Sequence, residues 1–152
     1  MSRYKTCTLA TFCLLATFAP WNVRGQISGC EKAQSTAEQA DCVNHQLSIV
    51  EDEMKHAFDR ALEMYTSKPE DQKANPVLPK SEEKEQLKWE EGMRRRLNIS
   101  QKAWLAYRES SCETVREMYE GGTAASVAVP LCKVDITKAR IEFLHSNFGD
   151  EH

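Results

Sequence analysis

The chain has 152 residues, of which 41% are hydrophobic, 28% charged and 8% aromatic. This composition supplies enough apolar side chains for one folded core, and it excludes a disordered chain and a large multidomain enzyme. The formal net charge of −3 excludes the basic footprint of a general nucleic-acid binder. No apolar run reaches the roughly 20 residues of a transmembrane helix, so we expect no membrane span.

The first 25 residues have the pattern of a secretory signal peptide. Arg3 and Lys5 precede an apolar stretch that ends at Pro20, and a cleavage site follows at Gly25. The alternative, an N-terminal core helix, would lack a polar face. Cleavage would leave residues 26–152 as a single domain with 17 basic and 23 acidic residues, a net charge of −6. We therefore expect a periplasmic or secreted protein.

Four of the six cysteines remain after cleavage: Cys30, Cys42, Cys112 and Cys132. An even set in an oxidising compartment indicates two disulfides, and four cysteines allow three pairings. Because Cys30 and Cys42 are close in sequence, as are Cys112 and Cys132, we predict these two bridges. Zinc binding is the alternative, but no CxxC or Cys/His spacing supports it. Residues 27–30 also resemble a lipoprotein acceptor box, but polar residues separate them from the apolar run.

A long amphipathic helix is predicted from Val43 onward. Its apolar residues recur at steps of three and four, which places them on one face: Val43, Leu47, Val50, Met54, Ala57/Phe58, Ala61 and Tyr65. Charged residues cover its other sides. The next segment, from Thr66 to Lys80, contains three prolines and is predicted to be an exposed loop.

A second helix is predicted to start at Ser81, because glutamates follow where the helix dipole favours acidic side chains. Its predicted apolar face holds Leu87, Leu97, Ala103/Trp104, Tyr107, Ser111, Val115 and Met118/Tyr119. Gly92 and the three consecutive arginines 94–96 predict a bend or break near its middle. Gly121 and Gly122 are predicted to end it by adopting left-handed conformations.

A last helix is predicted to open at Pro130. Its predicted inner side holds Cys132, Ile136, Ala139/Arg140 and Phe143. No β-alternation of useful length occurs anywhere in the chain. The sequence therefore predicts an all-α bundle or hairpin of three to four helices, stapled by disulfides.

One segment of the second helix carries a specific signature. It reads Ser100-Gln101-Lys102-Ala103-Trp104-Leu105-Ala106-Tyr107-Arg108-Glu109-Ser110-Ser111-Cys112, followed by Tyr119-Glu120-Gly121-Gly122-Thr123, Cys132 and Arg140. This pattern resembles the N-terminal domain of the LprI-like lysozyme inhibitors, over essentially the whole of residues 26–152. The resemblance implies a secreted or lipid-anchored bacterial protein, with lysozyme inhibition as the activity attached to the family name.

The side chains of this signature are predicted to be structural. Trp104, Tyr107 and Cys112 can share one helical face, and Trp104 is interpreted as a core anchor rather than a ligand platform. Arg108 and Arg140 are predicted to tie helices together through carboxylates or helix-end carbonyls, rather than to bind a partner. A turn is predicted between Cys112 and Cys132, and a bridge between these cysteines would fix its shape. Its residues are Tyr119, Gly121, Gly122 and Thr123.

Neither a catalytic site nor a cofactor is predicted. The chain has no nucleophile elbow, phosphate loop or HExxH motif. Glu53-x-x-His56 and Glu142-x-x-His145 have the spacing of di-iron ligands, but both histidines point outward if Met54 and Phe143 face the core. We therefore expect a protein that is not an enzyme.

Two functions are compatible with these observations. The first is inhibition of lysozyme-type muramidases, by blocking the cleft with its paired carboxylates after electrostatic attraction to a basic lysozyme. The candidate contact surfaces are the loop from Thr66 to Lys80, the loop from Gly121 to Val129, and the acidic residues Glu82, Glu83, Glu85, Glu90 and Glu91. These acids are also predicted to form salt bridges with arginines 94–96. The alternative is a non-catalytic module that binds another envelope protein or acts as a scaffold.

Overall fold

A computed structural model describes residues 29–66 and 79–149, and these form three helices. Helix α1 spans Thr36–Glu63, α3 spans Lys80–Met118 and α4 spans Ala125–Phe148. The described residues contain no strand, so the prediction of an all-α fold is confirmed. The expected signal peptide, residues 1–25, and most of the expected loop from Thr66 to Lys80 lie outside the described residues.

Helix α1 starts at a reciprocal cap. The Ser35 hydroxyl accepts a hydrogen bond from the Glu38 backbone N–H (3.2 Å), and the Glu38 carboxylate accepts one from the Gln34 N–H (2.8 Å). Such contacts satisfy the donors that a helix start leaves unpaired. The buried residues are Ala40, Val43, Val50, Ala57 and Ala61. The apolar face predicted for this helix is therefore confirmed.

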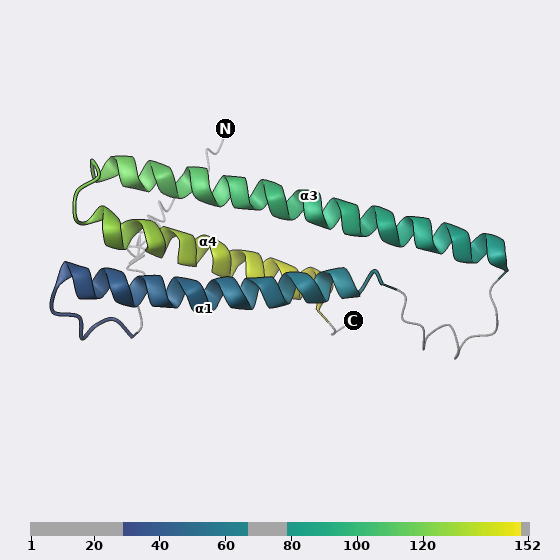
Figure 1. The fold of residues 1–152 in the computed structure, drawn as a ribbon, viewed down its shortest axis with the longest axis horizontal. Helices are drawn as coiled ribbons and strands as arrows, with labels where there is room; N and C mark the ends of the chain where they lie inside the picture. The colour runs from purple at the N-terminus through teal and green to yellow at the C-terminus, as the bar shows by residue number, and fades with distance from the viewer. Residues whose placement is uncertain (1–28, 67–78, 150–152) are drawn as a thin grey trace, which may run out of the picture.

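Helix α3 is continuous for 39 residues, about 58 Å at 1.5 Å per residue. The predicted bend at Gly92 and arginines 94–96 is wrong. A single helical glycine weakens a helix by about 1 kcal/mol without breaking its hydrogen-bond ladder, and arginine is a good helix former. Figure 1 shows the first part of α3 running past the ends of α1 and α4.

Helix α3 ends where the backbone enters the left-handed region at two successive residues. Glu120 has φ 50° and Gly121 has φ 67°. The Gly121 N–H reaches back to the Arg116 carbonyl (3.4 Å), and the Gly122 N–H donates to the Tyr119 carbonyl (2.8 Å). Gly121 thus takes the predicted conformation, which costs glycine little. Glu120, rather than Gly122, is the second left-handed residue.

Helix α4 begins at Ala125 and not at Pro130, so its predicted start is wrong. Pro130 is buried as the sixth residue of the helix. The turn before it is tight, because the N–H groups of Ala125, Ser126 and Val127 donate to carbonyls three residues earlier. A proline this close to a helix start removes only one interior hydrogen bond, which the adjoining tight turn accommodates.

Helix α4 lies between α1 and α3 and packs on both (Figure 1). Leu144 is 1% exposed and packs with Ala57 and Ala61 of α1. Val129 and Ala125 pack with Cys112 of α3. The predicted inner position of Phe143 is wrong, because this ring is 48% exposed and its neighbour Leu144 takes the core position. No helix of the described residues could span a membrane.

Both predicted disulfides are present. Cys30–Cys42 joins the segment before α1 to its second turn, with 5.9 Å between the Cα atoms. Cys112–Cys132 joins α3 to α4 on either side of the connecting turn, with 5.7 Å between the Cα atoms. Each bridge closes a short loop, so one constrains the start of α1 and the other constrains the turn between α3 and α4.

Candidate binding surfaces and the arginine centre

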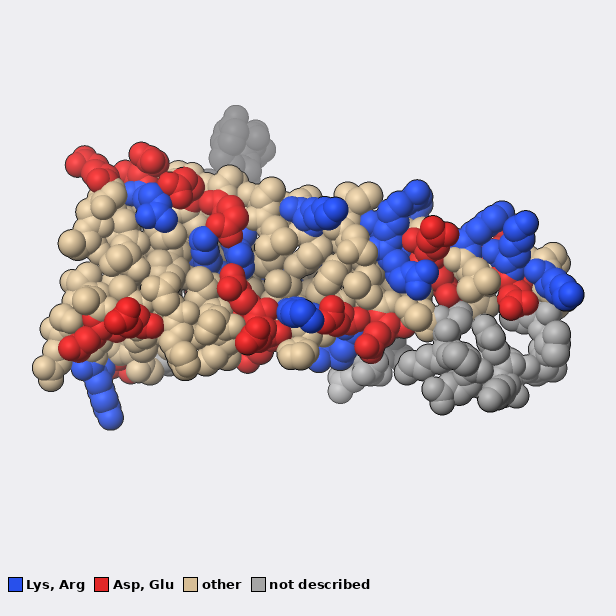
Figure 2. All heavy atoms as spheres, in the orientation of Figure 1, with Lys and Arg blue, Asp and Glu red and all other residues tan. Residues whose placement is uncertain are grey.

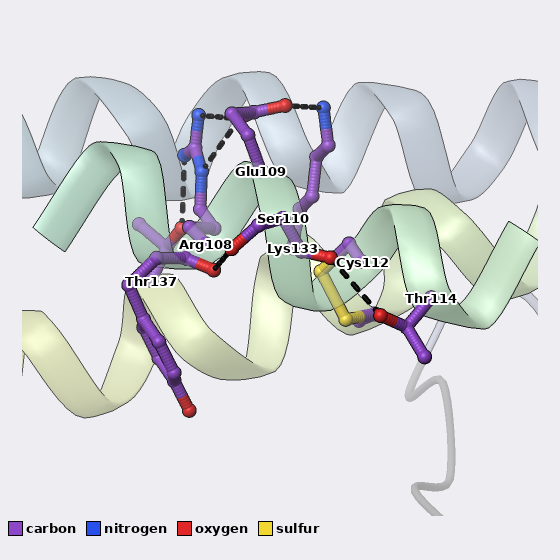
Figure 3. Close-up of a disulfide and its surroundings, with 9 residues drawn as sticks. Arg108, Glu109, Ser110, Cys112, Thr114, Lys133 and Thr137 are labelled. Atoms are coloured by element: carbon purple, nitrogen blue, oxygen red, sulfur yellow. Dashed lines mark hydrogen bonds and ion pairs between the residues drawn. A yellow bond between two sulfur atoms is a disulfide. The ribbon is translucent and has the colours of Figure 1, made fainter.

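Arg108 is the centre of an ion-pair network that joins all three described helices. Its buried guanidinium lies 2.9 Å from Glu51 of α1, donates to the Thr137 hydroxyl of α4 (3.1 Å), and pairs with Glu109 (2.9 Å). Lys133 of α4 also binds Glu109 (Figure 3). The hydrogen bond from Lys133, assisted by Arg108, lowers the pKa of Glu109. These contacts give Arg108 the helix-tying role expected of it.

Arg140 of α4 ties this helix to α3 through different partners. Its Nε donates to the Gln101 amide oxygen (3.1 Å) and its Nη2 to the Ser100 hydroxyl (3.2 Å), both on α3. Its Cζ lies 5.9 Å from the Trp104 ring centroid and 5.2 Å from that of Phe143. The expected role in joining helices is present, but the partners are neutral side chains and aromatic rings instead of a carboxylate or a helix-end carbonyl.

The inner face of α3 differs from the predicted apolar face. Its buried positions hold Glu90, Leu97, Gln101, Arg108 and Cys112. Tyr107, predicted to share the core face, is 59% exposed, and Trp104 is only partly buried at the edge. Gln101 and Arg108 occupy the core because partners on α1 and α4 satisfy their polar atoms. Hydrophobic periodicity alone missed this face, since its central residues are polar.

The acidic residues at the start of α3 do not form an acidic surface. Residues 80–96 contain six basic and five acidic side chains, and Figure 2 shows Lys and Arg standing among Glu over this part of the helix. Glu90 is 6% exposed and accepts a hydrogen bond from Gln86 (3.0 Å). Glu85 pairs with Lys88 (2.9 Å). Glu82, Glu83 and Glu91 are exposed.

The predicted salt bridges of arginines 94–96 are also absent from the described residues. Arg94 instead donates to the Thr66 hydroxyl (3.4 Å), and Arg96 contacts the Met93 sulfur. Consecutive residues on a helix point about 100° apart, so the three guanidinium groups diverge and cannot all meet the same carboxylates.

The excess negative charge lies on α1. This helix contains seven acidic and two basic residues, and acidic side chains predominate along it in Figure 2. Steps of 11, 7 and 4 residues place Asp41, Asp52, Asp59 and Glu63 on the face opposite the buried one. We call these four residues the acidic stripe. Asp59 pairs with Lys55 (2.6 Å), whereas Asp41, Asp52 and Glu63 make no ion pair within the described ranges.

The two predicted contact loops have different outcomes. The segment from Thr66 to Lys80 lies outside the described residues except at its ends. The loop predicted from Gly121 to Val129 is wrong in its second half, because α4 starts at Ala125 and both Ala125 and Val129 are buried. Only a short exposed turn, residues 121–124, remains beside the disulfide.

The two ExxH elements do not converge. His56 is exposed on α1, and His145 of α4 contacts Arg60 through its Nε2 (2.8 Å). No three His, Cys, Asp or Glu side chains in residues 29–66 and 79–149 are arranged to hold a metal.

These features define a small, disulfide-linked helical protein whose three described helices are joined by buried arginines. The family model for the lysozyme inhibitor LprI matches residues 29–144, most of the chain, so the protein belongs to this family. The resemblance inferred from the signature around Trp104 is thereby confirmed. No curated protein and no solved structure matches the chain significantly.

Proposed function

We propose that this protein is a secreted or periplasmic inhibitor that binds lysozyme-type muramidases. The observation that carries the proposal is the match to the lysozyme inhibitor LprI family, which covers both disulfides, α1 and α3, and most of α4. Two disulfides suit an oxidising compartment outside the cytoplasm. In this proposal residues 1–25 direct secretion and residues 26–152 form the single inhibitory domain.

The charge distribution supports α1 as the surface that meets a basic lysozyme. Residues 26–152 carry a net charge of −6, and the acidic stripe concentrates negative charge on one outward face. A complementary field raises the rate of encounter, while shape complementarity sets how long the complex lasts. Inhibition would then be steric, since the bound helix covers the cleft that holds the glycosidase carboxylates.

A binding role also accounts for the polar centre of the molecule better than catalysis does. The guanidinium of Arg108 and the carboxylate of Glu109 are engaged in contacts that hold α1, α3 and α4 together. A catalytic site needs convergent groups that can reach a substrate. We therefore propose a protein that is not an enzyme and needs no cofactor.

The test is a lysis assay with the disulfide-bonded secreted protein. Bacterial cell walls are mixed with lysozymes of different types and net charge, and the loss of turbidity is followed with and without the protein. Saturable inhibition of at least one lysozyme supports the proposal. If no lysozyme is inhibited at a large molar excess, the alternative of an envelope interaction or scaffold module replaces it.

A further inference from the structure

Arg140 carries a buried positive charge that no described carboxylate compensates. The residue is 8% exposed, and the ion pairs of the described residues do not include it. Its neighbour Arg108 pairs with the carboxylates of Glu51 and Glu109, whereas the hydrogen-bond acceptors of Arg140 are the neutral oxygens of Ser100 and Gln101. A buried charge without a counter-ion keeps a desolvation cost that neutral acceptors offset only in part.

One edge of the Arg140 guanidinium reaches the surface. Its Nε and Nη2 donate to Gln101 and Ser100, while Nη1 makes no hydrogen bond within the described part of the chain. No fully buried side-chain nitrogen there lacks a partner, so Nη1 is not fully buried. Ser100, which Nη2 binds, is itself exposed. The guanidinium is therefore open at its edge, next to an exposed hydroxyl.

Aromatic rings border the same guanidinium. Trp104 and Phe143 lie 5.9 and 5.2 Å from its Cζ. Phe143 is 48% exposed, and Tyr107, one helical turn beyond Trp104 on α3, is 59% exposed. Exposed aromatic rings around a partly desolvated arginine are the composition of energetic centres in protein interfaces. Burial also lowers the pKa of Arg140, which is consistent with its missing counter-ion.

We propose that Arg140, Trp104, Phe143 and Ser100 form a receptor for the carboxylate of an acidic peptide segment in a partner protein. One uncompensated positive charge matches one carboxylate, and the planar guanidinium favours this group over other acceptors. The exposed rings supply apolar area for the side chains beside the acid. This site, on α3 and α4, is independent of the acidic stripe on α1 and of lysozyme binding.

The test uses two blocked tripeptides, Leu-Glu-Leu and Leu-Gln-Leu, titrated into the disulfide-bonded secreted protein. Nuclear magnetic resonance follows the Trp104 indole N–H and the Arg140 Nε–H. We expect the Glu peptide to shift both signals saturably and to bind at least about tenfold more tightly than the Gln peptide, because only it carries a charge. Equal shifts with the two peptides, or no shift at about 10 mM of either, overturn the proposal.

Three variants locate the effect, with the Trp104 signal as the common readout. Arg140→Lys keeps the charge but loses the planar guanidinium that can donate two parallel hydrogen bonds to a carboxylate, so we expect about tenfold weaker binding. Phe143→Ala removes an exposed ring and should weaken binding about two- to fivefold. Lys138→Gln is the matched control, since it removes an exposed charge from the same helix and should leave binding unchanged.

Circular dichroism checks that each variant is folded. If Arg140→Lys does not fold, the comparison of Phe143→Ala with Lys138→Gln decides the question. Binding by Arg140→Lys that equals that of the unmodified protein would show that Arg140 only joins helices. Equal binding by Phe143→Ala and Lys138→Gln would overturn the assignment of Phe143 to the receptor.

Discussion

The Nη1 atom of Arg108 on α3 lies 2.9 Å from the Glu51 carboxylate on α1. This ion pair connects α1 directly to α3, although each of these helices packs mainly on α4. Arg108 also donates a hydrogen bond to Thr137 of α4. The three described helices are therefore held by a polar centre as well as by apolar packing.

Removing Arg108 should destabilise the fold strongly. We expect Arg108→Met to lower the free energy of unfolding by about 3 kcal/mol, because it removes the buried group that joins three helices and leaves the Thr137 hydroxyl without this donor. Glu51→Gln should cost only about 1 kcal/mol, since this carboxylate is 41% exposed and water screens its interaction. Urea unfolding measures both. Glu53→Gln, an exposed position on the same helix, is the control and should change stability by less than about 0.5 kcal/mol.

Two substitutions test which side chains form the core, one at a buried residue of α4 and one at an exposed residue of α3. Leu144→Ala should cost about 2 to 5 kcal/mol, because Leu144 is 1% exposed and its removal leaves a cavity. Tyr107→Ala should cost less than about 0.5 kcal/mol, because its side chain lies mostly in solvent. Thermal unfolding of both variants provides the comparison. A large loss of stability in Tyr107→Ala would show that Tyr107 is buried, on the apolar face that the sequence alone predicts for α3.

Each disulfide should contribute about 3 kcal/mol, because the bridged cysteines are separated by 12 and 20 residues. Cys112→Ser with Cys132→Ser should therefore lower the midpoint of urea unfolding, and Cys30→Ser with Cys42→Ser should lower it by a similar amount. Peptide mass mapping of the unmodified protein should yield these two bridges and no free thiol. A bridge between the two groups would contradict the structure.

Glu109 should make stability depend on acid pH. Lys133 and Arg108 hold its pKa below the usual value, so the folded state binds this proton less readily than the unfolded state. The stabilising contribution is thus complete above the unfolded pKa of about 4.3, and it is lost as the pH falls through the folded value. Glu109→Gln should flatten the decline in unfolding free energy between about pH 5 and pH 3. An unchanged slope would show that other carboxylates dominate the acid transition.

The acidic stripe should control association with a basic lysozyme. Asp41→Lys, Asp52→Lys and Glu63→Lys together change the net charge of residues 26–152 from −6 to 0. We expect association to slow by about one to three orders of magnitude at low salt, with little difference near 1 M salt, where the screening length is about 3 Å. Surface plasmon resonance at both salt concentrations measures the rates.

The matched control for that experiment reverses Glu82, Glu83 and Glu91. This triple change to Lys alters the net charge by the same amount, but at exposed positions already surrounded by basic side chains. It should slow association much less than the α1 variant. Equal effects of the two variants would show that net charge, and not the face of α1, attracts the lysozyme.

Local sequence determined much of the architecture. The steps between Val43, Val50, Ala57 and Ala61 predict the buried face of α1, because apolar side chains occupy all of its buried positions. Cysteine spacing predicts both disulfides, since each pair is close along the chain. Gly121 predicts the end of α3, because few other residues adopt a left-handed conformation at low cost.

Only the tertiary structure decided which side of α3 faces inward and where negative charge collects. Gln101 and Arg108 are buried because their partners, Arg140, Glu51 and Thr137, arrive from other helices across 29 or more positions in the chain. The periodicity of apolar residues contains no information about such pairs. It therefore predicts, wrongly, that the face of α3 with Tyr107 is buried. The acidic stripe became a surface for the same reason: α4 covers one face of α1, and the carboxylates remain on the other.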